Sequence, residues 1–139
     1  MHPQLNPVQF GKAFADSPDG SPAPNLVDIT GISVRRAQTQ SEVEQVFDVR
    51  WAGYKKYFST RAEIVDFFDE ASNAVLLLAV DVDGRPLGTI RLLDRRHGAI
   101  ELDQLVAVDS LLTPQQYPVV EATRFSMPHG SQSRSVTKA

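Results

Sequence analysis

The chain contains no cysteine, and this absence excludes disulfide bonds, thiolate metal sites and a cysteine nucleophile. It also lacks an excess of basic residues, because 14 lysines and arginines stand against 17 acidic residues, for a net charge of −3. Such a balance offers no broad electrostatic surface to nucleic acid or to an anionic membrane. No apolar run reaches the roughly 18 residues of a membrane helix, and the first residues lack the features of a secretory signal. We therefore expect a cytoplasmic protein.

Metal-binding and cofactor-binding motifs are absent as well. The three histidines, His2, His97 and His129, are scattered, and no two of them have the spacing of metal ligands. The sequence has no phosphate-binding glycine fingerprint, no nucleophile elbow and no redox motif. We expect no metal and no bound cofactor.

What the chain does have is the composition of one domain, with 139 residues of which 42% are hydrophobic. Residues 1–31 hold five of the nine prolines, which predicts a flexible arm, although Val27 and Ile29 could dock on the domain. Residues 32–126 form the predicted domain, and residues 127–139 a polar tail.

The hydrophobic pattern predicts an α+β fold. Residues 32–37 begin with alternating apolar and polar residues, which predicts a first strand with one covered face. Ser41 and Glu44 have the spacing of a capping box, and a helix then continues through apolar residues at three- and four-residue steps to Phe58. Arg50 lies inside that apolar stripe. A second short helix is expected over residues 61–68.

The second half of the domain reads as strands. Residues 73–80 form a nearly continuous apolar run, and Asp83-Gly84 predicts a tight turn that returns residues 87–93 antiparallel to it. Residues 99–106 give a weaker fourth strand, and residues 119–126 a fifth. The order of elements predicts a mostly antiparallel sheet flanked by helices.

Charged residues on these strands need a reason, since a buried strand excludes ions unless they are paired or face a cavity. Arg91 is the only charge on its face of the strand over residues 87–93. Glu121 and Arg124 lie three residues apart, so they share a face only if their strand is bulged or splayed. They mark either a structural ion pair or a site.

Five features in this order resemble the acyl-homoserine-lactone synthases and the related N-acyl amino acid synthases of the GNAT acyltransferase superfamily; they are Arg50, Asp66-x-x-Asp69, Gly88-Thr-x-Arg91-Leu, Glu101 and Glu121-x-x-Arg124-Phe. The resemblance implies a GNAT-like fold with a splayed fifth strand. It also implies a buried charge cluster of Arg91, Asp66 and Asp69 beside the site of the acceptor amine. We expect Arg50 to reach the same cluster, since its place in the apolar stripe otherwise has no compensation, and Thr123 to bind the substrate with them.

The same resemblance implies acyl transfer from a thioester, either on acyl carrier protein or on coenzyme A, to an amine. Glu121 is then the candidate base, and Arg124 orients Glu121 or binds the acceptor's carboxylate. The aromatic residue that follows the helix in lactone synthases has no clear counterpart here, since Trp51 comes directly after Arg50. This difference favours an amino acid over S-adenosylmethionine as the acceptor.

Two alternatives stay open: a lactone synthase, and a non-catalytic domain that binds a small ligand or a partner chain. The resembling enzymes continue beyond the fifth strand into a donor-binding loop and helix, which residues 127–139 could at most begin. We therefore expect a truncated domain with little turnover on its own and an exposed sheet edge that favours homo-oligomers. Arg95, Arg96 and His97 with Lys55 and Lys56 form either a small basic patch for a carrier protein or a solvated hairpin end.

Overall fold

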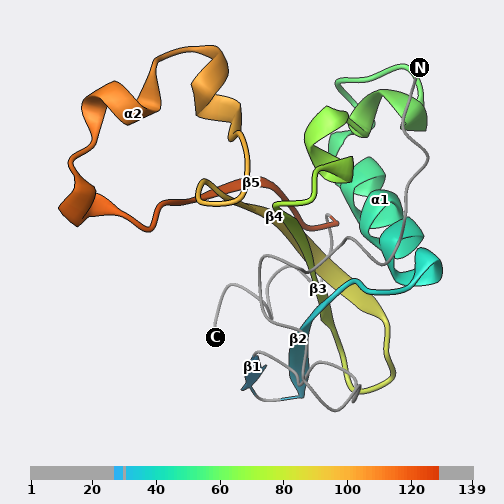
Figure 1. The fold of residues 1–139 in the computed structure, drawn as a ribbon. Helices are drawn as coiled ribbons and strands as arrows, with labels where there is room; N and C mark the ends of the chain where they lie inside the picture. Colours follow the sequence, from blue (N-terminus) through green and yellow to red (C-terminus); the bar gives the residue numbers. More distant parts are fainter. Residues whose placement is uncertain (1–26, 30, 129–139) are drawn as a thin grey trace.

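The computed structural model describes residues 27–29 and 31–128, and these form an α+β fold around one antiparallel sheet (Figure 1). The strands follow one another in chain order across the sheet as β1 (Val27–Ile29), β2 (Ile32–Arg36), β3 (Ala74–Val80), β4 (Pro86–Asp94) and β5 (Val120–Ser126). The helices are α1 (Gln40–Tyr54) and α2 (Val108–Leu111), with 3-10 turns η2 (Arg61–Ile64), η3 (Phe67–Glu70), η4 (Glu101–Gln104) and η5 (Pro114–Gln116). The α+β architecture predicted from sequence is thus confirmed.

Helix α1 packs against one face of the sheet through its predicted apolar stripe. Val46 and Phe47 are buried against Leu76 and Leu78 of β3, in a cluster that also contains Ala37, Val43, Val49, Ile64 and Val80. Burial of such side chains is worth about 1.5–3 kcal/mol each before the entropy of ordering them is subtracted. This contact fixes the position of α1 over β3 and β4.

The start and end of α1 differ from the sequence prediction. Thr39, rather than Ser41, caps the helix, because its hydroxyl accepts a hydrogen bond from the Glu42 N–H at 3.2 Å and the Glu42 carboxylate accepts one from the Thr39 N–H at 3.1 Å. Both pairs have capping-box spacing, so sequence alone could not separate them. The helix ends at Tyr54, and Phe58 lies beyond it.

The hairpin of β3 and β4 is confirmed. Leu76 pairs with Arg91 and Leu78 with Thr89, and the connecting turn places Gly84 at φ 77°, in the left-handed region that glycine tolerates. Side chains of paired residues share a face, so Arg91 lies on the face that α1 covers.

Two further predicted boundaries are wrong. The arm of residues 1–31 reaches too far, since β1 at Val27–Ile29 pairs with β2. Residues 61–68 form no single helix, because the chain is extended at Val65 and Asp66 between two 3-10 turns. Residues 1–26 and 129–139 lie outside the described residues, with His2, His129 and most of the predicted tail.

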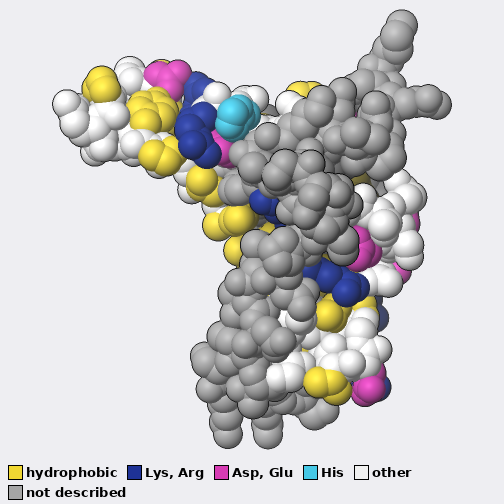
Figure 2. Space-filling view, turned by 60° about the horizontal axis from the view of Figure 1, so that its bottom comes forward, with side chains coloured by type: hydrophobic (Ala, Val, Ile, Leu, Met, Phe, Trp, Pro, Cys, Tyr) yellow, Lys and Arg dark blue, Asp and Glu magenta, His cyan; other side chains and the backbone are white. Residues whose placement is uncertain are grey.

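The predicted strand over residues 99–106 is also wrong, because Glu101–Gln104 forms η4. Its apolar residues do not alternate strictly: Ile100 is buried with Phe68 and Leu93, whereas Leu105 is 81% exposed. The segment from Arg95 to Val119 extends from the sheet as a projection that contains η4, α2 and η5 (Figure 1). Hydrophobic side chains lie on the surface of this projection (Figure 2). None of the helices in the described residues has the length and apolar character needed to cross a membrane.

Candidate functional site

Six charged side chains from distant parts of the sequence meet on the face of the sheet that α1 covers. Three are arginines and three are acids, so the cluster is electrically balanced. They come from α1, the η3 turn, β4, η4 and β5, and are Arg50, Asp66, Asp69, Arg91, Glu101 and Arg124.

Arg91 is the centre of this cluster and has no exposed surface. Its Nη1 lies 2.5 Å from Asp66 Oδ1 and 3.0 Å from Asp69 Oδ1, and its Nη2 lies 3.0 Å from Glu101 Oε1. Its Nε donates to the Thr123 hydroxyl at 3.2 Å. A buried guanidinium persists only with such compensation, because an uncompensated buried charge costs several kcal/mol.

Arg124 joins the cluster through a bulge in β5. Thr89 pairs with Ser126 and Arg91 with Thr123, so β5 carries one extra residue there, and Arg124 takes a left-handed φ of 55°. Its Nη2 lies 2.7 Å from Asp66 Oδ2 and 2.9 Å from Glu101 Oε1. The bulge that the sequence interpretation required is present, and it turns Arg124 to the face of Arg91. Non-glycine residues rarely adopt this conformation outside functional or tightly packed sites.

Arg50 is completely buried but only partly paired. Its Nη1 donates to Asp69 Oδ2 at 2.8 Å and to the Ile64 carbonyl at 3.1 Å, and its guanidinium carbon lies 5.4 Å from the centre of the Phe47 ring. Its Nε and Nη2 have no hydrogen-bond acceptor within the described part of the chain. Unpaired buried donors are rare in native proteins, and each calls for an explanation such as a ligand.

A cavity of about 240 Å³ lies beside this cluster, and Arg50 is one of its walls. Its other lining residues are Tyr54, Phe58, Glu63, Ile64, Asp66 and Arg124. The Tyr54 hydroxyl donates to the Phe125 carbonyl at 2.5 Å and so joins the end of α1 to β5. The cavity therefore combines cations, carboxylates and an apolar wall, as sites for small zwitterionic molecules do.

The arginines of the cluster keep Asp66 ionised. Burial alone would raise the pKa of Asp66, but hydrogen bonds and charge from Arg91 and Arg124 outweigh it and hold that pKa below the ordinary value. Burial likewise opposes the charge of Arg91, and Asp66, Asp69 and Glu101 together raise its pKa. Both groups are charged at neutral pH, so Asp66 is a poor proton acceptor.

Glu121, the candidate base from sequence, reaches the cluster only indirectly. Its Oε1 accepts a hydrogen bond from the Glu101 N–H at 2.8 Å, and its Oε2 accepts one from the Leu102 N–H at 3.0 Å. Glu121 thereby caps the start of η4, and Glu101, which η4 carries, makes the contacts to Arg91 and Arg124. The structure brings together every other predicted site residue.

Sequence reasoning did not select Tyr54, Phe58 or Glu63 as site residues. Tyr54 and Phe58 were assigned to the apolar stripe of the helix; Tyr54 packs there in part, whereas Phe58 lies beyond the end of α1. Glu63 gave one usable signal, since it lies three residues before Asp66, as Asp66 does before Asp69.

The proposed basic patch for a carrier protein is largely neutralised. Arg95 lies 3.2 Å from Asp103 and 2.6 Å from Asp109, and Arg96 lies 2.6 Å from Asp94. Within the described ranges, no group of three histidine or acidic side chains is placed to hold a metal ion.

Comparison with known proteins gives no family assignment: no family model, no curated protein and no solved structure matches this chain.

Proposed function

We propose that the chain is an N-acyltransferase domain that moves a fatty acyl group from a thioester to the amine of an amino acid. The donor is acyl carrier protein or acyl-CoA, and the fold is GNAT-like. The observation that carries the proposal is the cavity beside the charge cluster, which is lined by arginines and by acids and so presents both signs of charge.

The cavity chemistry supports a zwitterionic acceptor. A carboxylate would bind the half-exposed Arg124, since guanidinium groups match carboxylates in charge and geometry. An ammonium group would be held by the carboxylates that line the same cavity. Tyr54, Phe58 and Ile64 supply an apolar wall for a side chain.

The size of the cavity favours an amino acid over S-adenosylmethionine. A volume of about 240 Å³ accommodates on the order of eight water-sized groups, which suits an amino acid about as large as leucine. S-adenosylmethionine is several times larger. The lactone-synthase alternative is therefore less well supported.

The roles of the remaining residues follow from their contacts. Asp69 and Arg91 fix Arg50 and Asp66 in place, and Glu121 fixes Glu101 through η4. Such positioning brings an amine to a thioester carbonyl in one orientation, which supplies much of the rate advantage of an acyl transfer.

The test incubates the purified chain with a long-chain acyl carrier protein or acyl-CoA and a panel of amino acids. N-acylated products are detected by mass spectrometry, and acceptor binding is followed separately by NMR titration. We expect binding of amino acids with apolar side chains, with Arg124→Ala weakening it about tenfold or more. No binding of any amino acid would contradict the proposal.

A second candidate is a non-catalytic domain that binds an amino acid. The capping role of Glu121 favours it, because the carboxylate expected to act as base is already engaged by two backbone N–H groups. Saturable binding without product from either donor would support this candidate.

A further inference from the structure

We infer that Glu63 holds the ammonium group of the acceptor and takes a proton from it. This inference rests on the proposed function, and it assigns the role of the base to a residue that sequence reasoning did not select. The carboxylates at or near the cavity differ in the contacts that already occupy their oxygens.

Four of these carboxylates are committed to other contacts. Asp66 accepts hydrogen bonds from Arg91 and the Phe68 N–H on one oxygen and from Arg124 on the other. Asp69 is shared between Arg91, Arg50 and the Asp66 N–H. Both oxygens of Glu121 accept backbone N–H groups, and Glu101 binds two arginines and does not line the cavity.

Glu63 differs from these four in its free oxygen. Its Oε2 accepts hydrogen bonds from the Ser59 N–H at 2.8 Å and the Thr60 N–H at 3.3 Å, which fixes the side chain at the start of η2. Among the described residues, no donor binds its Oε1 and no arginine or lysine is paired with its carboxylate. Glu63 is exposed and lines the cavity, so a carboxylate that is fixed at the start of η2 and keeps one free oxygen borders the space that Arg50 and Arg124 also line.

The proposed reaction transfers the acyl group from the thioester sulfur to the amine nitrogen. The acceptor arrives as R–NH₃⁺, and Glu63 removes one proton and passes it to solvent. The free amine attacks the thioester carbonyl, the new C–N bond forms and the C–S bond breaks. The second nitrogen proton ends on the departing thiolate, so the products are an amide and a thiol. A positioned carboxylate contributes about 10²–10⁴-fold to such a step.

Glu63→Gln separates this role from capping, because glutamine can still accept the two backbone hydrogen bonds of a capping box. The probes are L-leucine and 4-methylpentanoate, which lacks the ammonium group, each titrated by NMR into the intact chain. The native chain should bind leucine about tenfold more tightly than 4-methylpentanoate. Glu63→Gln should abolish that preference and lower the formation of N-acyl leucine about 100-fold or more.

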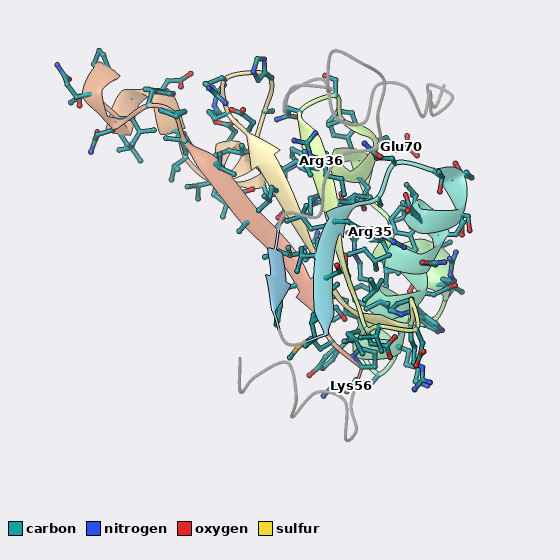
Figure 3. The ribbon with its side chains drawn as sticks, turned by 90° about the horizontal axis from the view of Figure 1, so that it is seen from below. Arg35, Arg36, Lys56 and Glu70 are labelled. Atoms are coloured by element: carbon teal, nitrogen blue, oxygen red, sulfur yellow. The ribbon has the colours of Figure 1, made fainter. Side chains whose placement is uncertain are left out.

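Glu70→Gln is the matched control. Glu70 does not line the cavity. In Figure 3 it lies far from Lys56, which is two residues beyond Tyr54, a residue of the cavity wall. This variant should keep both the preference and the turnover. Thermal unfolding of Glu63→Gln and Glu63→Ala checks the fold, and only the alanine variant should lose stability through the cap.

The two proposals fail in different ways. A Glu63→Gln variant that retains the native preference for leucine and the native turnover overturns the role of Glu63 and leaves the acyltransferase proposal standing. A native chain that forms no N-acyl amino acid from either donor counts against the proposed function and with it against proton transfer. Ammonium binding by Glu63 is tested separately, by whether Glu63→Gln loses the preference for leucine over 4-methylpentanoate.

Discussion

At the scale of single residues, the site is a set of buried charges that stabilise one another and leave one cation incomplete. Arg91 makes contacts with three acids, whereas Arg50 shares Asp69 with it and keeps unpaired donors. A balanced buried cluster contributes little net stability, although removing one member leaves its partners uncompensated. Arg50 therefore supports the fold through Asp69 and, as a wall of the cavity, can also support binding.

Arg50→Met tests this division of roles. We expect the free energy of unfolding in urea to fall by about 3 kcal/mol because Asp69 loses one of its two cations. Leucine binding, measured by NMR titration, should also be lost. Arg85→Met, at a hairpin residue that is 60% exposed, should change stability by less than about 0.5 kcal/mol. Raised stability with unchanged binding would show that Arg50 is a dispensable structural charge.

Asp66 gives the cluster a dependence on pH. Its pKa in the folded state lies below the ordinary value of 3.8, so its contribution to stability is fully present above that value and is lost as the pH falls through the folded-state pKa. Asp66→Asn should therefore be less stable than the native chain at pH 7, and the gap should narrow below about pH 4. Urea unfolding at several pH values measures the gap, and a constant gap would contradict the prediction.

At the scale of secondary-structure elements, close contacts between α1, β5 and η4 shape the cavity and the cluster. A Cβ at Gly53 of α1 would lie 2.1 Å from the Ser126 hydroxyl oxygen, so glycine is required for α1 to approach β5 this closely. The hydroxyl of Ser126 donates to the Val49 carbonyl at 3.2 Å. Glu121 ties η4 to β5 in the same way, through two backbone N–H groups.

Gly53→Ala should separate α1 from β5. The clash with Ser126 should lower the free energy of unfolding by about 1–3 kcal/mol, despite the higher helix propensity of alanine. Adding Ser126→Ala should restore most of that loss, since the alanine at 53 would then meet the Cβ of residue 126 at 3.4 Å, an ordinary contact. Chemical denaturation of both variants checks this, and additive losses in the double variant would rule out the clash.

Glu121→Ala should release η4 from β5. The N–H groups of Glu101 and Leu102 would lose their acceptor, at a cost of about 1–3 kcal/mol in stability. Hydrogen exchange should accelerate at these two amides before it changes in β3 or β4. Unchanged exchange at both amides would mean that another contact holds η4 in place.

At the scale of the whole molecule, α1 covers one face of the sheet, and β5 is one of its two edge strands. β5 is the last strand in the sheet order, and no other described strand pairs with its outer edge. Exposed apolar residues lie close by on β5 and on the projection, namely Leu102, Leu105, Val106, Leu111, Val120 and Phe125. Open edges and apolar surface of this kind promote association between chains.

Self-association that depends on concentration is therefore expected, and Val120→Lys should reduce it. Val120 is 45% exposed at the start of the edge strand, and a lysine there opposes strand pairing between copies. Light scattering coupled to size-exclusion chromatography measures the mass at several concentrations. Val82→Lys, at an equally apolar but distant hairpin residue, serves as the control and should leave the mass unchanged.

Local signals in the sequence were enough to predict several of the elements. The apolar stripe of Val43, Val46 and Phe47 predicts α1, and Asp83-Gly84 predicts the hairpin. Alternation along β4 places Arg91 on the covered face, and the three-residue spacing of Glu121 and Arg124 required a bulge. Each of these follows from the periodicity of one segment or from the chemistry of one turn.

Which charged groups contact one another depends on the folding of the whole chain. Glu121 contacts a backbone N–H group 20 residues away, and Arg124 contacts an acid 58 residues away. The extended backbone at Thr39 and the packing of Ile100 with Phe68 and Leu93 likewise settled the cap of α1 and the 3-10 turn that replaced a predicted strand. At these two places the local sequence favours neither alternative strongly. Contacts with residues distant in the sequence therefore determine which conformation has the lower free energy.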